Sequence, residues 1–352
     1  MIKMKKFILI LIILCSCCGE DNRFYAISKD IVNNERDYYI FDSIAGHIHK
    51  SNARRDYVWP EHKDGKVIFK TNNLGFRSDV DTNIDKQGRI RILVTGDSHI
   101  DGVINNSESC CTILQNMLNQ ASYGKLYEVI NSGTGYYFSR NYLGVIEKYL
   151  YLAPDVYIVI LYGGNEFLKT CSLIGCRRSD NPGYYAKLRE VRSFNPGGVA
   201  QSLNQIYYFK NVPESMEISV KSATDDIYAI KQICELNHIT LIVLLLPSKI
   251  EIEWSTDELS LNKSKELLQL TDADLEINLQ LLNKLASWLN NQQISYLNLF
   301  DYMKGKDHKL FWNKDHHLND YGHKVIAETL FATYKDKIFQ RGEARVANGN
   351  NE

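Results

Sequence analysis

The sequence has no excess of charge of either sign. Lys and Arg total 41 and Asp and Glu total 42 among 352 residues, which gives a formal net charge of -1. Proteins that bind nucleic acid present a basic patch or stripe, and none stands out here, so a nucleic-acid partner is not expected. Internal repeats and low-complexity tracts are also absent. The hydrophobic fraction of 44% and the charged fraction of 24% are those of a globular protein with one large domain and at most a small appendage.

A hydrophobic run long enough to span a bilayer is missing from the N-terminal segment. Three lysines precede an apolar run over residues 7–14, which has the length of a signal-peptide core. The stretch Leu14-Cys15-Ser16-Cys17 resembles a bacterial lipobox, which predicts a lipoprotein signal peptide over residues 1–17 and lipidation of Cys17. The protein would then be exported to the bacterial cell envelope and anchored to a membrane by lipid, on the periplasmic face or the cell surface. A plain signal peptide cleaved nearby is the alternative, because Cys15 and Cys18 blur the register.

The remaining cysteines lack the spacing of a metal site. There are five of them: Cys110, Cys111, Cys171, Cys176 and Cys234. No second Cys-x-x-Cys and no partner pair of histidines accompanies them, so neither a structural zinc nor another metal or cofactor is expected. In an oxidising compartment Cys171 and Cys176 could form a disulfide, whereas Cys110 and Cys111 lie in a helical pattern and are typical of core positions. The odd count leaves at least one free thiol.

Short apolar runs alternate with amphipathic stretches from Arg89 onward. The runs predict strands over residues 90–95, 127–130, 156–161, 240–246 and 295–299. Helical periodicity lies between and after them, over residues 113–118, 142–149, 227–236, 259–289 and 321–334. This alternation predicts an α/β fold with a parallel sheet and helices on both faces.

Breaks in this rhythm set the expected boundaries. Residues 18–65 have no sustained period and suit a tether or an N-terminal accessory segment, and residues 66–338 form the predicted domain. Asn-Pro-Gly occurs at 181 and again at 195, which predicts an inserted lobe over about 176–220. Residues 339–352 are expected to be a disordered tail.

Polar segments follow the predicted strands at the edge where a parallel sheet binds its ligand. In chain order they are Gly96-Asp97-Ser98, Asn131-Ser132-Gly133-Thr134-Gly135, Gly163-Gly164-Asn165-Glu166 and Asp315-His316-His317-Leu318-Asn319. Each alone is ordinary turn chemistry. Their joint placement is what predicts a site.

These segments contain the parts of a nucleophilic serine site. A serine hydroxyl such as that of Ser98 needs a base to remove its proton. Asp315, two residues before His317, can accept from one ring nitrogen and leave the other free toward Ser98. Asp315 could instead cap the last helix or form a turn. Asp-His-His could also suggest metal ligation, but the sequence has no third ligand at a matching spacing. Backbone N–H groups of Ser98 and of the glycine turn, with the side-chain amide of Asn165, would serve as oxyanion donors.

The four segments resemble, in order, the four blocks of the SGNH (GDSL-like) hydrolase family, over about residues 70–335. Thr71-Asn72-Asn73-Leu74-Gly75-Phe76-Arg77 is similar to a segment that often precedes the serine block in bacterial members. The resemblance implies a flavodoxin-like three-layer α/β/α sandwich with a five-stranded parallel sheet. It favours His317 over His316, because the following His-Leu-Asn and Tyr-Gly-His resemble the family's continuation.

Two departures from the family pattern affect the expected roles. The family more often has Asp-x-x-His, and the Asp-x-His spacing here resembles relatives that acetylate alginate. The glycine block is one residue shorter than usual, so Gly135 is the first choice as oxyanion donor and Gly133 the reserve.

The resemblance implies a serine esterase or deacylase that works through an acyl-enzyme. The expected substrate is an ester-bearing small molecule, a glycan with O-acetyl groups or a lipid. A carbohydrate O-acyltransferase with the same triad and a non-catalytic lipoprotein that binds a glycan or a partner protein are the alternatives.

Overall fold

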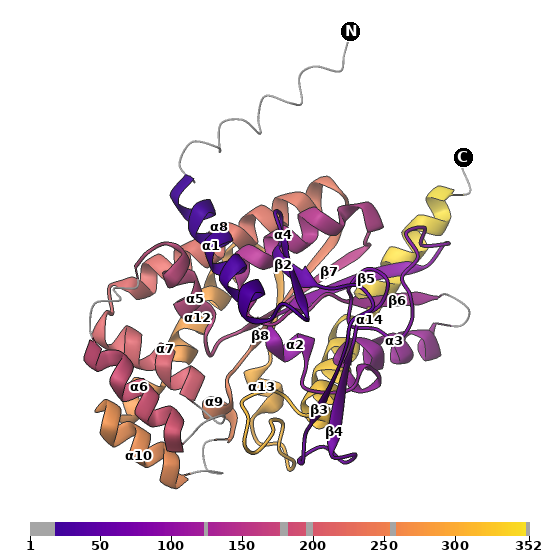
Figure 1. The fold of residues 1–352 in the computed structure, drawn as a ribbon. Coiled ribbons are helices and arrows are strands. Elements are labelled where there is room, and N and C mark those ends of the chain that lie inside the picture. The colour runs from indigo at the N-terminus through magenta and orange to yellow at the C-terminus, as the bar shows by residue number, and fades with distance from the viewer. Residues whose placement is uncertain (1–17, 123–125, 177–181, 195–199, 254–257, 350–352) are drawn as a thin grey trace.

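A computed structural model describes residues 18–122, 126–176, 182–194, 200–253 and 258–349 (Figure 1). The predicted signal peptide and Cys17 lie outside these residues. Within them, no helix combines the length and the apolar character needed to cross a membrane.

A five-stranded parallel sheet forms the centre of the domain. Its strands are β5 (Ile90–Gly96), β6 (Tyr127–Asn131), β7 (Val156–Tyr162), β8 (Thr240–Leu246) and β9 (Ser295–Asn298), in the spatial order β6-β5-β7-β8-β9. Every residue of β5 and of β7 is buried, as expected for strands covered on both faces. The order is the flavodoxin-like one, so the predicted fold is confirmed, with strand ends within one residue of those expected.

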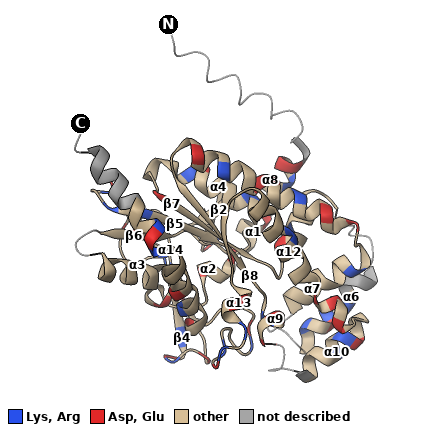
Figure 2. Ribbon diagram, turned by 180° about the vertical axis from the view of Figure 1, so that it is seen from behind, with Lys and Arg blue, Asp and Glu red and all other residues tan. Residues whose placement is uncertain are grey.

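Helices cover both faces of the sheet, each over its own hydrophobic core. One face carries α4 (Ser139–Tyr149), α8 (Ser215–Leu236) and α12 (Ile277–Asn291), and the other carries α3 (Cys110–Ala121) and α14 (Asp320–Gly349) (Figure 1). Short elements complete the core of the domain: η2 (Asn106–Glu108), η3 (Leu150–Leu152), α9 (Lys249–Glu253) and α13 (Phe300–Met303). In the described part of the chain, acidic and basic residues are interspersed over the outer helices (Figure 2).

The predicted helical stretch 259–289 is three helices. They are α10 (Glu258–Leu268), α11 (Asp272–Leu275) and α12. Gln269 adopts a positive φ of 57°, which ends α10, and the side chain of Thr271 caps the start of α11 by accepting from the N–H of Asp274. The apolar periodicity of the sequence did not indicate these helix ends.

The predicted lobe over 176–220 is not a separate unit. It contains α6 (Pro182–Phe194), α7 (Ala200–Asn211) and the start of α8, and it follows α5 (Glu166–Leu173). Leu203, Ile206 and Phe209 of α7 are completely buried in the same core as one face of the sheet. These helices therefore extend the main core.

The N-terminal segment is folded. It comprises α1 (Cys18–Asn34), the hairpin β1 (Tyr39–Asp42) with β2 (Gly46–His49), and the hairpin β3 (Arg54–Val58) with β4 (Lys66–Lys70). The phenol of Tyr137 donates to the carbonyl of His47 at 2.5 Å, and Phe24 packs edge-on against Phe138. Residues 18–65 are thus an accessory segment packed on the domain and not a loose tether. At the other end, α14 continues to Gly349, so residues 339–349 of the predicted disordered tail are helical, and residues 350–352 lie outside the described residues.

The cysteines that could have formed a disulfide are free thiols. Cys171 is buried on α5 and its thiol donates to the phenol of Tyr208 at 3.3 Å, while Cys176 follows the helix as a separate thiol. The possible Cys171–Cys176 disulfide is not formed in the structure, although the two thiols interact. Cys110 and Cys111 are buried in the core, as predicted.

A buried ion-pair network joins the accessory segment to the helix that follows β5. Asp101 accepts from His49 at 3.1 Å and from Arg77 at 3.0 Å, and all three side chains are at most 5% exposed. Burial alone would raise the pKa of Asp101, but His49 and Arg77 outweigh it and lower that pKa. The network therefore stabilises the fold above the ordinary carboxyl pKa, and this stabilisation is lost as the pH falls through the folded-state pKa.

Replacing Asp101 by alanine is expected to lower the free energy of unfolding by about 3 to 5 kcal/mol at neutral pH, because it leaves a buried guanidinium without its partner. Urea denaturation measures this change. Asp56→Ala is the control, since Asp56 pairs with Arg54 on the surface and such pairs contribute little. Equal, small losses for both variants would show that the network is not a structural link.

Candidate active site

The polar turn after β5 has a local physical cause at each position. A side chain at Gly96 would collide with Ile100 and with the carbonyl of Ile160, so the strand must end on glycine. Asp97 caps the short helix α2 (Ser98–Asp101) by accepting from the N–H of His99 at 3.0 Å. Gly102, with φ of 78°, ends α2 after one turn. Ser98 is thereby placed at the carboxyl end of a central strand, on the first residue of α2.

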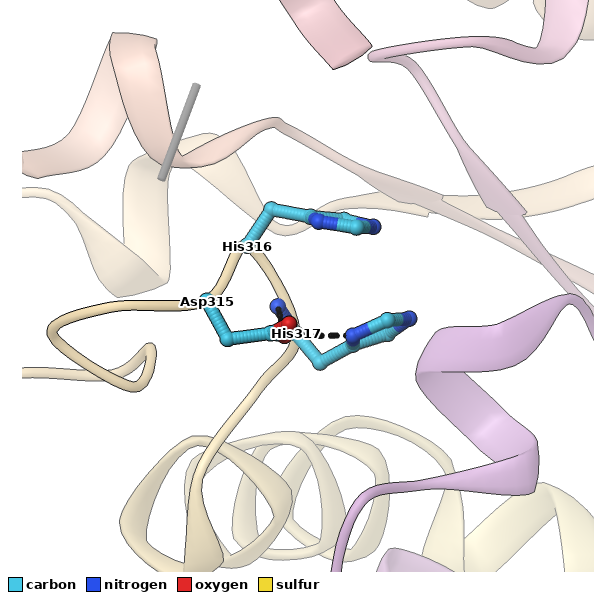
Figure 3. A group of neighbouring side chains, drawn as sticks. All are labelled: Asp315, His316 and His317. Carbon is cyan, nitrogen blue, oxygen red and sulfur yellow. Dashed lines mark hydrogen bonds and ion pairs between the residues drawn. The ribbon is translucent and has the colours of Figure 1, made fainter. Parts of the chain in front are cut away.

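The loop before α14 is shaped by the Asp-x-His spacing. The carboxylate of Asp315 accepts from the backbone N–H of His317 at 2.7 Å and from its ring Nδ1 at 2.5 Å, so the side chain closes a tight turn (Figure 3). A bridge between Phe311 and Leu318 closes the base of the loop. Two residues of separation are therefore enough for the acid to orient the imidazole.

Ser98, His317 and Asp315 form one hydrogen-bond chain. The distance from His317 Nε2 to Ser98 Oγ is 2.8 Å, across 219 residues of sequence. Because a carboxylate can only accept, Nδ1 of His317 donates to Asp315, and in the neutral imidazole Nε2 then accepts from the Ser98 hydroxyl. This is the tautomer that a general base for a serine requires.

Burial and the acid act in opposite directions on this pair. Burial alone would lower the pKa of His317, but the charge and hydrogen bond of Asp315 outweigh it and raise that pKa. Burial would likewise raise the pKa of Asp315, yet His317 holds that pKa below its ordinary value. The acid thus stays ionised while the imidazole titrates.

The raised pKa of His317 predicts how the rate of ester cleavage through Ser98 would fall at acid pH. Only the neutral imidazole can take the serine proton, so kcat/KM should fall as the pH drops through a midpoint above about 6.5, the ordinary value for histidine. Asp315→Asn should move this midpoint down, because burial remains and the charge is gone. Initial rates from pH 5 to 9 measure it. A wild-type midpoint at or below 6.5 would contradict the assignment.

Two further imidazoles lie beside His317. The ring of His316 stacks on it with centroids 4.1 Å apart (Figure 3), and the ring of His99 lies at 5.1 Å. Burial, reinforced by His317 and His316, holds the pKa of His99 well below its ordinary value, so His99 is neutral. The base therefore has the neutral imidazole of His99 on one side, and the ring of Tyr162 lies against His99 with centroids 3.8 Å apart.

Asp315, His316 and His317 also bring one potential metal ligand each to within 4.8 Å of one another, a grouping found in the described residues. Asp315 and His317 already use these atoms to bond each other and Ser98. A metal ion bound through His317 would therefore compete with the serine hydrogen-bond chain for a ring nitrogen. That the protein uses no metal stays a prediction.

Asn165 has the features of an oxyanion donor. It follows β7, which pairs with β5 so that Ile160 lies opposite Gly96, and both strands end at the same edge of the sheet. Asn165 is 3% exposed, and neither atom of its amide has a hydrogen-bond partner in the described part of the chain. A buried amide without a partner is costly, which points to a role other than stability. Gln205 on α7 supports this turn by donating to the carbonyl of Gly163 at 2.6 Å.

The glycine turn after β6 does not present the expected donor. The N–H of Gly135 donates to the carboxylate of Asp101 at 3.2 Å, and the N–H of the reserve, Gly133, donates to the side chain of Asn131 at 2.9 Å. The amides of Ser132 and Thr134 are bonded to β5 carbonyls. Gly135 and Gly133 are therefore corrected as oxyanion donors, which leaves the amides of Ser98 and Asn165 from the predicted set.

Residues outside the predicted set also support the site. His49, Arg77 and Asp101 fix the helix that starts at Ser98, and only Arg77 lay in a segment with a recognised pattern. His49 lies in the accessory segment, whose sequence has no sustained period. The one sequence signal for this support was the acidic residue Asp101, which follows Ser98 by one helical turn in Ser-His-Ile-Asp.

Comparisons with known proteins find likeness only at the level of structure. No protein-family model and no curated protein matches the chain. Solved structures with some similarity include an acetyl xylan esterase, at 16% identity over 69% of this chain and 98% of that chain with a TM-score of 0.42. A psychrotrophic esterase from a Pseudoalteromonas species has 13% identity over 71% and 98%, with a TM-score of 0.39. A GDSL-like lipase from Bacteroides thetaiotaomicron has 11% identity over 73% and 92%, with a TM-score of 0.39. Similarity at these values carries no information on function, which is inferred from the geometry of the site.

Proposed function

We propose that the protein is a serine ester hydrolase of the SGNH type. The observation that carries this proposal is the chain from Asp315 through His317 to Ser98, with 2.5 Å and 2.8 Å between its heavy atoms. It joins a serine at the end of β5 to a largely buried imidazole whose second nitrogen is held by a carboxylate, which is the arrangement that makes a hydroxyl nucleophilic at neutral pH.

The reaction follows from the direction of the hydrogen bonds. Ser98 Oγ attacks the ester carbonyl carbon while its proton passes to Nε2 of His317, and Asp315 stabilises the imidazolium that forms. The carbonyl oxygen, now negative, is met by the Asn165 amide and the Ser98 N–H. The tetrahedral intermediate collapses, His317 protonates the leaving alcohol, and Ser98 carries the acyl group. Water, deprotonated by His317, attacks this ester and releases the acid, and the proton returns to Ser98.

The substrate belongs to the same proposal. We infer an O-acyl ester on a carbohydrate or a lipid, met in the cell envelope by a protein that Cys17 anchors. If a sugar hydroxyl replaced water in the second step, the same residues would transfer the acyl group. The partition between hydrolysis and transfer is decided by which acceptor reaches the acyl-enzyme.

A panel of substrates tests the proposal. Purified protein is assayed with p-nitrophenyl esters of graded chain length and with acetylated xylan and alginate, with and without a free glycan as acceptor. Release of the phenol or of acetate by wild type, and none by Ser98→Ala, is expected. Acetate that appears on the acceptor glycan would identify transfer. If wild type and Ser98→Ala both bound a glycan and neither turned over any ester, the proposed hydrolase activity would be overturned and a glycan-binding lipoprotein favoured.

A further inference from the structure

The loop that carries Asp315 and His317 is fastened to the rest of the protein through its backbone. Charged side chains from two other parts of the chain hold residues 310–315, and none of them belongs to the triad. One of these side chains is that of Lys249, the first residue of α9, which follows β8. Lys249 is 5% exposed, an unusual position for a lysine.

The ammonium of Lys249 donates to three carbonyl groups of the loop. The distances from Nζ are 2.7 Å to Trp312, 2.8 Å to Asn313 and 3.3 Å to Asp315. An ammonium has three N–H groups, so all of them point to one short segment. Burial lowers the pKa of Lys249, while the charges of Glu253 and Asp315 act to raise it. A buried cation that uses every donor on neighbouring carbonyls fixes their directions closely.

Two carboxylates hold the N–H groups of the same segment. Glu253, one turn after Lys249 on α9, accepts from the N–H groups of Leu310 and Phe311. Glu61, in the turn between β3 and β4, accepts from the N–H groups of Asn313 at 2.6 Å and Lys314 at 2.9 Å. The carbonyl groups of this segment thus bond to one ammonium group, and its N–H groups bond to two carboxylates.

We infer that Lys249 is a positioning residue for the base, which sets the place of His317 and Asp315 against Ser98 through the backbone of residues 312–315. The inference rests on the proposed function. Only 2.8 Å separates Ser98 Oγ from His317 Nε2, and the two come from elements that share no strand or helix. A displacement of about 1 Å in such a contact can lower the rate on the order of a hundredfold. Glu61 adds a second hold from the accessory segment.

Lys249→Met tests this inference, with Lys249→Arg as the conservative variant. Methionine keeps the length and loses the donors, so kcat should fall about a hundredfold with little change in KM. Arginine, which keeps the charge and donors, should recover part of the loss. Lys86→Met is the matched control, because Lys86 is also largely buried and donates to the carbonyl of Ala153 and to Asp155, away from the site. It should cost stability without lowering kcat.

The pKa of His317 separates positioning from simple loss of charge. Removing a nearby positive charge would raise this pKa, whereas moving Asp315 away from the ring would lower it. We expect Lys249→Met to lower it, measured by NMR titration of the imidazole. This readout does not need turnover, so it distinguishes failure of the inference from failure of the proposed function.

Glu61→Ala keeps the test open if Lys249→Met does not fold. Glu61 is only partly buried and its loss removes the acceptor for two loop N–H groups. The expected result is a smaller fall in kcat and a shift of the His317 pKa in the same direction. Wild-type kcat together with an unchanged or raised His317 pKa in the folded Lys249 or Glu61 variants would overturn the inference.

Discussion

Replacing His317 by alanine should lower kcat about a million-fold, because the serine then has no base and the leaving alcohol no acid. Ser98 Oγ hydrogen-bonds Nε2 of His317 at 2.8 Å, and Asp315 holds the opposite nitrogen. KM should change little, since the imidazole contributes to the transition state far more than to ground-state binding. Initial rates on the best ester of the panel, with active-site concentration known, measure the loss.

His316→Ala is the matched control for this prediction. The two histidines are neighbours in sequence and their rings stack at 4.1 Å, but Ser98 and Asp315 bond to His317. The control should keep kcat within about tenfold of wild type, a loss that packing next to the base can cause. If His316→Ala abolished turnover and His317→Ala did not, the base would have been assigned to the wrong residue.

Asn165→Ala should lower kcat by about a hundred- to a thousandfold, the usual cost of one oxyanion donor. Its amide is buried without a hydrogen-bond partner among the described residues, so it is free to meet the negative oxygen that forms on the ester. For the same reason the free energy of unfolding should hardly change. Steady-state kinetics and urea denaturation of one preparation measure both quantities.

Asn141→Ala provides the opposite pattern. Asn141 is also buried, but its side chain donates to the carbonyl of Ala45 and accepts from the N–H of Phe138. Its loss should reduce stability by about 1 to 3 kcal/mol and leave kcat near wild type. An Asn165 variant that loses stability and keeps its rate would show that Asn165 is a structural asparagine.

The central fold was predictable because its signals are local. Strands such as Val156–Tyr162 are continuous runs of buried Val, Ile, Leu and Tyr, and parallel strands bring their carboxyl ends to one edge. From the sequence alone, that rule predicts Ser98 near Asn165 and His317. The Asp-x-His spacing also carried local information, since it permits the turn that the structure contains.

The remaining features depend on contacts that sequence patterns do not encode. From the sequence, Lys249 would be assigned as a surface lysine at the start of a helix. Only the folded chain places its ammonium group against the backbone of residues 312–315. Gly135 matched a donor by position, but Asp101, brought there by α2, takes its amide. Cys171 and Cys176 are close in sequence and their thiols interact, yet both are free and the thiol of Cys171 donates to Tyr208. In each case a partner far along the chain decides the role.

Labelling with a fluorophosphonate tests the central claim most directly, because a serine that a neighbouring base activates displaces fluoride from the reagent and is phosphonylated. Folded protein is treated with the probe, and the site of attachment is mapped by peptide mass spectrometry. We predict one adduct, on Ser98, which is absent from Ser98→Ala and forms far more slowly in His317→Ala. Folded wild-type protein that acquires no adduct on Ser98 would contradict the claim.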